Sequence, residues 1–447
     1  MTITLETSLA TFRSRFRKSG ELTEKTRALI PGGFSRRTFN FGPHAIFAES
    51  GEGPWIHTVD GLTLLDLNNN FTVNILGHRH PAITRALEEA LSQGFSFGNP
   101  TSAEAELAHL LVDRIESVER IQFSCSASES CLSAVRIARG FTGKSKIAKF
   151  EGGYHGFTDG LAISAHPGPT PDAGPDSDPQ PVADTAGIPP ADLDAAVILP
   201  QNDPVNCERI LRANASEIAC LIRELQSGAG GVVALDVDFV QLLRDLTKAL
   251  GIVLVFDETI SLRAGYHGLQ GIYGVKPDLT VMGKMIGGGL PIGAVGGSAE
   301  VMQVVEDDVV RISGTHHGHC LSLAAGAACM ETMDQTAFAR LNAMAARVVL
   351  EVNEWSLREN YPFQIYGQGF SHLAYAFTDR PDRRIHTHRD FWRYVDTAKT
   401  FTCSLELANR GYFPVHRGEL SLSLPMSSDD ITGFIETTKE IVTGIQT

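Results

Sequence analysis

Lys284 and Asp257 are the residues whose types and neighbours point most directly to chemistry in this sequence. Lys284 lies in the segment MGKMIGGGL, where small residues around a normally hydrated amine would let a ligand approach the backbone closely. Asp257 closes the apolar run IVLVFD. A pyridoxal phosphate enzyme needs this combination, because an amine forms the Schiff base and an acid holds the pyridine nitrogen protonated.

Small hydroxyl residues before a helical pattern form a candidate phosphate site. Ser126, Ala127 and Ser128 precede the helical run 131–140, and the free amides and dipole of a helix start attract anions. A plain serine N-cap is the alternative explanation for these residues. The repeated serines and the neighbouring strand patterns favour the phosphate interpretation.

The elements that must position these residues alternate between helix and strand patterns, which indicates an α/β fold with a parallel sheet covered on both faces. Ligands in such sheets bind beyond the carboxyl ends of the strands, so Tyr154, Glu224, Asp257 and Lys284 are expected along one edge. A core position is the alternative for Tyr154, which is flanked by glycines. Short apolar runs predict buried strands at residues 146–150, 195–199, 218–222, 252–256, 279–282 and 292–295.

Turn and cap signals complete this outline. Thr101, Ser102 and Glu104 fit a capping box that opens a helix, and residues 53–67 alternate like a β-hairpin. Residues 166–190 are rich in proline, aspartate and glycine, which predicts a long surface loop, either a tolerated insertion or a mobile cover over a site.

A composition change near residue 330 predicts the division into domains. We expect an N-terminal segment, 1–60, that belongs with a smaller domain, a large cofactor-binding domain, 61–329, and a C-terminal small domain, 330–447.

Composition excludes several classes of protein. A formal net charge of −14 over 447 residues argues against a nucleic-acid or anionic-membrane surface. Seven cysteines without paired spacing favour a reducing compartment, so we expect a cytoplasmic protein. The first twenty residues lack the apolar core of a signal peptide, and no apolar stretch is long enough to span a membrane.

The ordered motifs SASE (126–129), YHG (154–156), FDE (256–258) and GK (283–284) resemble those of the class III (ω-) aminotransferases of fold type I. The most similar branch is that of glutamate-1-semialdehyde aminomutase and the β-amino-acid transaminases, and the likeness covers nearly the whole chain. It implies a large domain with a mostly parallel seven-stranded sheet, a smaller α+β domain, and pyridoxal 5′-phosphate as cofactor.

The resemblance assigns roles to the candidate residues. Lys284 matches the Schiff-base lysine, and Asp257 matches the carboxylate that pairs with the pyridine nitrogen. Tyr154 matches the aromatic residue that stacks on the cofactor ring, and Thr259 packs on its opposite face. The phosphate is bound by the segment that contains Ser126, Ala127 and Ser128.

Further residues are placed near the cofactor by the same resemblance. Glu224 matches a glutamate near the cofactor, and His155 is expected to support the site from behind rather than to react. Gly314 and Thr315 match a loop that reaches the phosphate of the neighbouring subunit, which implies a homodimer with shared active sites. Three positions depart from the family pattern, with Ala127, Leu225 and Thr259 standing where the family has glycine, proline and valine.

Two arginines are the candidates for substrate binding, because guanidinium pairs in a bidentate manner with carboxylate. Arg36 falls where the β-amino-acid transaminases have a carboxylate-binding arginine. Arg417 falls where they have a second arginine for the keto-acid partner. A solvated surface position is the alternative for each.

These assignments predict an aminotransferase that moves an amino group from a β- or ω-amino acid to an α-keto acid. The alternatives are an aminomutase of the glutamate-1-semialdehyde type, a decarboxylase or racemase on the same fold, and a cofactor-binding protein without turnover. No metal is expected, although His316, His317, His319 and Cys320 lie close together in the sequence.

Overall fold

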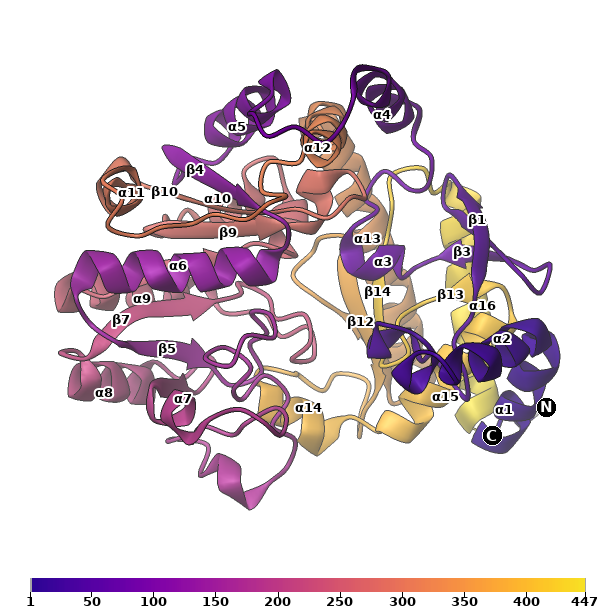
Figure 1. Cartoon of the computed structure of the whole chain (residues 1–447). Helices are drawn as coiled ribbons and strands as arrows, with labels where there is room; N and C mark the ends of the chain where they lie inside the picture. Colours follow the sequence, from indigo (N-terminus) through magenta and orange to yellow (C-terminus); the bar gives the residue numbers. More distant parts are fainter. Residues whose placement is uncertain (1, 447) are drawn as a thin grey trace. The chain divides into compact units, whose positions relative to one another are not determined.

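The computed structural model describes residues 2–446, which form two compact units (Figure 1). The large unit contains Pro81–Ala339 and Ile385–Arg393, and the small unit contains the residues up to His80, Arg340–Arg384 and those from Tyr394 onward. The predicted domain limits at 60/61 and 329/330 stay a prediction, and the compact units change at 80/81 and 339/340.

The large unit is built on a seven-stranded sheet with the strand order β4-β10-β9-β8-β7-β5-β6. Only β10 is antiparallel to its neighbours, so the sheet is mostly parallel, as the sequence predicts. The strands are β4 (Arg120–Ser124), β5 (Lys146–Phe150), β6 (Ala196–Leu199), β7 (Ile218–Arg223), β8 (Val253–Asp257), β9 (Leu279–Gly283) and β10 (Gly293–Gly297).

The six predicted strands correspond to β5 to β10, with ends that differ by at most two residues. Strand β4 was not predicted, because Arg120 and Gln122 interrupt its apolar character and its first three residues are only half-buried. Its position matters, because β4 leads directly into the candidate phosphate segment.

Helix α6 (Ala127–Thr142) lies along the sheet and buries one face against it (Figure 1). Ser126 caps its start, since the Ser126 hydroxyl accepts from the amide of Glu129, and Gly143 ends it at a φ of 69°. Its buried stripe includes Cys131, Ala134 and Val135, which join a core with residues of β5, β7, β8 and β9.

The other helices of the large unit cover the sheet and its ends. Helix α5 confirms the helix predicted after Thr101, but the capping box is wrong, because the Thr101 side chain makes no cap hydrogen bond. The helices are α4 (Pro81–Gln93), α5 (Ser102–Arg114), α7 (Pro190–Asp194), α8 (Pro204–Asn214), α9 (Val237–Leu250), α10 (Gly268–Tyr273), α11 (Ala299–Glu306), α12 (Cys320–Thr332) and most of α14 (His388–Tyr394).

The small unit contains two sheets. The predicted hairpin is confirmed, since β2 (Trp55–Thr58) and β3 (Thr63–Asp66) pair antiparallel around Gly61, whose φ is 79°. One sheet has the order β1-β2-β3-β13 and the other β11-β12-β14. Their remaining strands are β1 (Ala48–Glu52), β11 (Phe363–Tyr366), β12 (His372–Phe377), β13 (Tyr412–Phe413) and β14 (Glu419–Ser421).

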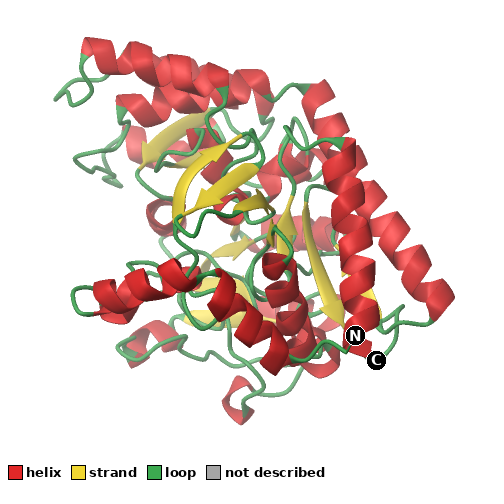
Figure 2. Cartoon of the chain, turned by 90° about the vertical axis from the view of Figure 1, so that its right-hand side faces the viewer, coloured by secondary structure: helices red, strands yellow, loops and turns green. Residues whose placement is uncertain are grey.

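The two ends of the described chain lie side by side in the small unit, where the amide of Ile3 donates to the carbonyl of Gly444 over 2.9 Å (Figure 2). Helix α13 (Gln335–Glu359) contains the change from the large unit to the small unit. The other helices of the small unit are α1 (Leu5–Arg15), α2 (Arg17–Arg27), α3 (Asn69–Thr72), α15 (Thr397–Asn409) and α16 (Ser428–Gln446).

Residues 166–190 contain no strand and only a short 3-10 turn at Pro171–Ala173 before α7 begins, which agrees with the predicted loop. Every helix among residues 2–446 is too short or too polar to cross a bilayer.

Candidate active site

The predicted catalytic and cofactor residues of the large unit follow the carboxyl ends of parallel strands. Tyr154 follows β5, Glu224 follows β7, Asp257 ends β8 and Lys284 follows β9. Because these strands run in one direction, their ends share one edge of the sheet, as expected for a ligand site in this architecture.

Lys284 begins a 3-10 turn in a left-handed backbone conformation, with a φ of 51°. Few residues other than glycine adopt this conformation, and such strain is concentrated at functional sites. The preceding Gly283 has no room for a side chain, because a Cβ there would lie 2.9 Å from the Ala127 methyl and 3.4 Å from Cγ2 of Thr259. Gly283, which precedes Lys284, therefore lies close to Ala127 and Thr259.

Asp257 is buried and both of its carboxylate oxygens have donors. Oδ2 accepts from Nδ1 of His155 at 2.9 Å and from Sγ of Cys131 at 3.4 Å, and Oδ1 accepts from the amide of Thr259 at 3.1 Å. Burial alone would raise the pKa of Asp257, but the bonds from His155 and Thr259 outweigh it and lower the pKa. Asp257 is held ionised in a buried setting.

The adjacent Glu258 has a different task. Its carboxylate accepts from the amides of Leu269 and Gln270 at the start of α10, so it holds α10 against the sheet. Of this pair, Asp257 is the residue whose carboxylate accepts the hydrogen bonds from His155 and Thr259.

Glu224 links the segments that carry the other site residues. It accepts from the amide of Tyr154 at 3.1 Å and from that of Gly228 at 3.0 Å. Removal from water, followed by the charge of Asp257, raises the pKa of Glu224 to about 8, although both amides and Lys284 oppose the shift. The group thus titrates near neutral pH inside the site.

The candidate phosphate segment is packed closely against two glycines. A Cβ on Gly293 would lie 2.2 Å from the carbonyl oxygen of Ser126, and one on Gly156 would lie 2.5 Å from Oγ of Ser128. The Ser126 hydroxyl serves as the N-cap, so the N-cap interpretation is correct for that side chain. The amides at the start of α6 remain the groups suited to an anion.

The residues present fit pyridoxal phosphate. An amine, an ionised buried carboxylate and a helix start lie at one sheet edge, and these match an aldehyde, a pyridine nitrogen and a phosphate. One buried polar atom of a residue bonded to Asp257, Nε2 of His155, has no hydrogen-bond partner in the protein. Unpaired buried polar atoms are costly, so their presence here is consistent with a polar ligand.

Two predicted features lie at the surface of the described chain. The Tyr154 side chain is 42% exposed, with its ring centroid 6.0 Å from that of His166 at the start of the long loop. Gly314 and Thr315 lie in an exposed loop that precedes α12. Their contacts with cofactor and partner subunit stay predictions.

The two predicted substrate arginines converge on one aromatic ring in the small unit. The Arg36 guanidinium lies 4.4 Å from the centroid of Phe71, and that of Arg417 lies 6.0 Å from the same centroid. Arg36 also donates to Oδ1 of Asn70 at 2.7 Å, and Arg417 forms an ion pair with Glu419. Burial alone would raise the pKa of Glu419, but Arg417 and His372 outweigh it and lower the pKa to about 2.

Phe71 is held by an unusual left-handed turn. Asn69, Asn70, Phe71 and Thr72 have φ values of 51°, 50°, 52° and 76°, a conformation that asparagine tolerates and that costs roughly 1 to 2 kcal/mol for each of Phe71 and Thr72. Side chains stabilise it: Asp66 accepts from the amide of Asn69, and Asn69 donates to the carbonyl of Ser421 at 2.6 Å. This strain is concentrated where the two arginines meet.

Three residues of these sites were not singled out from the sequence. Cys131 lies in the apolar stripe of α6, and nothing in the pattern shows that its thiol reaches Asp257. The contact of Phe71 with two arginines forms only when the fold brings those arginines together from distant parts of the sequence. Arg223 ends the apolar strand β7 and is buried between Phe150 and Phe256, and a charged residue closing such a strand is a signal that could have been used.

Comparisons with known proteins identify the family of this chain. A family model for class III aminotransferases matches residues 39–383. A curated relative, glutamate-1-semialdehyde 2,1-aminomutase of Desulfotalea psychrophila, is 38% identical over 370 residues, which cover 81% of this chain and 84% of the relative. A solved omega-transaminase from Sphaerobacter thermophilus is 34% identical, with a TM-score of 0.90 over 96% of this chain and 98% of that one.

A β-phenylalanine aminotransferase from Variovorax paradoxus is also similar in structure, with 27% identity and a TM-score of 0.88 over 98% of this chain and 97% of that one. The two structural likenesses extend over almost the whole chain. The chain belongs to the class III aminotransferases, an enzyme family of fold type I that depends on pyridoxal phosphate.

Proposed function

We propose that this enzyme is a transaminase that transfers an amino group from a β- or ω-amino acid to an α-keto acid. The observation that carries the proposal is the convergence of Arg36 and Arg417 on Phe71. A transaminase of this kind binds two different carboxylated substrates in turn. Two guanidinium groups beside one ring can pair with the carboxylate of each substrate.

The protein groups divide the remaining work. Bound pyridoxal phosphate supplies an electron sink for the carbon that carries the amino group. Lys284 is proposed to hold the cofactor covalently and to carry the proton between substrate and cofactor, and Asp257 to keep the pyridine nitrogen protonated. Tyr154 and Thr259 pack on the two faces of the ring, and Ser126, Ala127 and Ser128 bind the phosphate through the start of α6.

Apolar space beside Arg36 supports a donor with an apolar side chain. A cavity of about 380 Å³ in the small unit is lined by Phe39 and Asn70, the residues that also contact Arg36. The similar structure from Variovorax paradoxus is a β-phenylalanine aminotransferase. A carboxylate on Arg36 with an apolar group in this cavity is the arrangement we propose.

The enzyme is also proposed to be a homodimer in which Gly314 and Thr315 reach the phosphate of the partner subunit. Their exposure in the single chain supports this arrangement, because these residues are available to a second copy. Residues 61–329 are proposed as the cofactor-binding domain, with residues 1–60 and 330–447 forming the smaller one.

An aminomutase is the second candidate, and the names of the curated relatives favour it. A steady-state assay separates the two. Purified enzyme is supplied with an amino donor alone, then with the donor plus pyruvate or 2-oxoglutarate. We expect amino acid from the keto acid only when both substrates are present. Isomerised product from a single amino-aldehyde substrate would refute the transaminase and establish the aminomutase, and carbon dioxide release would indicate a decarboxylase.

A further inference from the structure

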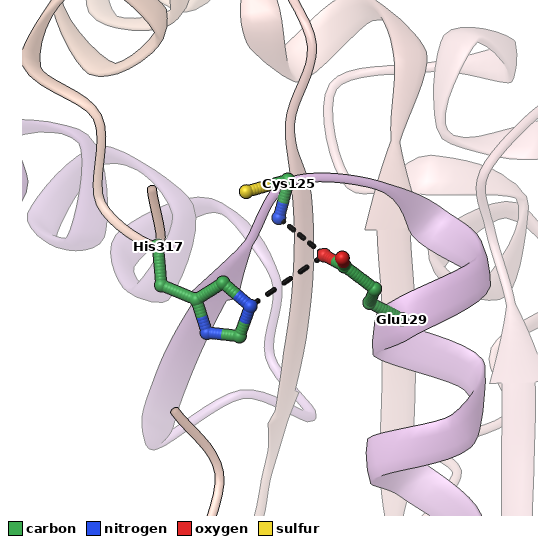
Figure 3. A group of neighbouring side chains, drawn as sticks. All are labelled: Cys125, Glu129 and His317. Carbon is green, nitrogen blue, oxygen red and sulfur yellow. Dashed lines mark hydrogen bonds and ion pairs between the residues drawn. The ribbon is translucent and has the colours of Figure 1, made fainter. Parts of the chain in front are cut away.

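Three side chains of metal-binding type converge at the start of α6 in the large unit (Figure 3). Cys125 lies just before the N-cap, Glu129 lies in the first turn of the helix, and His317 approaches from the separate loop that precedes α12. The thiol sulphur, a carboxylate oxygen and a ring nitrogen of these residues all lie within 4.8 Å of one another.

Helix capping explains the position of Glu129 but not the others. Oε2 of Glu129 accepts from the amide of Cys125 at 2.7 Å, a contact that resembles a capping box. The same oxygen lies 3.5 Å from Nε2 of His317. Neither the Cys125 thiol nor the imidazole contributes to the cap, and Nε2 of the imidazole faces the carboxylate (Figure 3).

These groups have unused capacity to bind a ligand. Nε2 of His317 faces Glu129, Nδ1 on the far side of the ring is buried without a hydrogen-bond partner, and the whole side chain is 15% exposed (Figure 3). Cys125 is the one half-buried cysteine among the seven, and the other six are buried. An ion can therefore reach this thiol through partly open surroundings, whereas the remaining thiols are enclosed.

We propose that Cys125, Glu129 and His317 form a binding site for a divalent cation of the Zn²⁺ class that strengthens retention of the cofactor phosphate. Thiolate, imidazole and carboxylate are Zn²⁺ ligands, and three protein ligands plus water complete a tetrahedron. In a tetrahedral Zn²⁺ site the ligand atoms lie roughly 3.3 to 3.8 Å apart. Side-chain movements of about 1 Å would therefore bring these three ligand atoms to the required separation. Coordination releases the thiol proton to water.

The ion has no part in the chemistry at Lys284. Only His317 of the histidine run 316–319 takes part, so this site differs from the sequence cluster that was not expected to bind metal. The effect of the bound ion on cofactor retention is electrostatic. Glu129 places a negative charge in the first turn of α6, beside the proposed phosphate site, and a bound cation offsets that charge. The cation also joins the α6 segment to the loop of Thr315.

Cobalt is the probe, because tetrahedral Co²⁺ with a thiolate ligand absorbs in the visible and gives a sulphur-to-metal band. Holoenzyme freed of metal by chelation is titrated with Co²⁺. The variants are Cys125→Ser, Glu129→Gln and His317→Gln, and the matched control is His316→Gln, which changes the exposed neighbouring histidine. Release of cofactor is then timed by dialysis, with and without Co²⁺.

We expect one Co²⁺ per chain, loss of the sulphur band in Cys125→Ser, and affinity at least roughly tenfold weaker in the other two variants. The control should bind as the wild type does, and Co²⁺ should slow cofactor release only where it binds. An absent band, a band that persists in Cys125→Ser, equal loss in His316→Gln, or unchanged release would each overturn the proposal. These readouts do not depend on the reaction type.

Discussion

Nδ1 of His155 donates to Oδ2 of Asp257 over 2.9 Å, and both side chains are buried. Since Asp257 is ionised and accepts, Nδ1 must carry the hydrogen. Burial lowers the pKa of His155, so the ring is neutral near pH 7. The pair therefore places a single negative charge at the end of β8.

Replacing His155 with Phe should weaken cofactor binding, because Asp257 would lose its strongest donor and its pKa would rise. The loss of one hydrogen bond to a charged group is worth about 1.5 to 3 kcal/mol, which corresponds to roughly 10- to 150-fold in the dissociation constant. Absorbance titration of the cofactor-free protein with pyridoxal phosphate measures the dissociation constant. The control is Cys131→Ser, which keeps a donor near Oδ2. Unchanged affinity in His155→Phe would show that His155 does not support cofactor binding.

Lys284→Ala should lower transamination by about 10⁴ or more, as expected when an essential member of a catalytic group is lost. Borohydride reduction followed by peptide mapping should find the pyridoxyl adduct at Lys284 in the wild type and nowhere in the variant. Lys276→Ala is the matched control, because Lys276 is an exposed lysine paired with Glu116 on the same unit. An adduct on another lysine would refute the assignment.

Glu224→Gln should change how the stability of the cofactor-free protein depends on pH. The folded protein raises the pKa of Glu224 from 4.5 to about 8, so between these values it holds a proton that the unfolded chain has lost. Stability of the wild type therefore falls as pH rises through this window. The melting temperature of the variant minus that of the wild type should increase with pH, and a constant difference would contradict the shift.

Arg417 should contribute mainly to binding of the keto acid. Its removal also leaves Glu419 buried without its main partner, which would destabilise the fold. We therefore compare Arg417→Ala in a Glu419→Gln background with Glu419→Gln alone. The KM for the keto acid should rise by about 10- to 150-fold, with a much smaller change for the amino donor. Equal changes in both KM values would show that Arg417 does not discriminate between the substrates.

Phe71→Leu should raise the KM for both substrates, because the ring lies beside both guanidinium groups. A cation–π contact is worth about 0.5 to 2 kcal/mol, or roughly 2- to 30-fold. Phe39→Leu is the matched control, since Phe39 contacts Arg36 over 5.2 Å and should affect the amino donor alone. If neither KM changes in Phe71→Leu, the ring has no part in substrate binding.

Much of the large unit could be predicted from the sequence, because buried parallel strands form apolar runs whose ends carry Tyr154, Asp257 and Lys284. Periodicity and glycine turns are local signals, so they specify where a strand ends. The half-buried strand β4 was missed because the polar residues Arg120 and Gln122 interrupt its apolar pattern.

Contacts between distant segments could not be predicted in the same way. The thiol of Cys131 meets Asp257, and Arg36 meets Arg417 through Phe71, only after folding. The capping box predicted at Thr101 is wrong for a different reason. The residue types fit the motif, but the Thr101 side chain makes no hydrogen bond to the start of the helix.

The left-handed turn at Asn69–Thr72 sets two properties of the enzyme against each other. Glycine at position 71 would relieve backbone strain at a φ of 52°, yet it would delete the ring that lies beside both guanidinium groups. A change that relaxes the backbone at this position would therefore weaken the proposed binding of both substrate carboxylates.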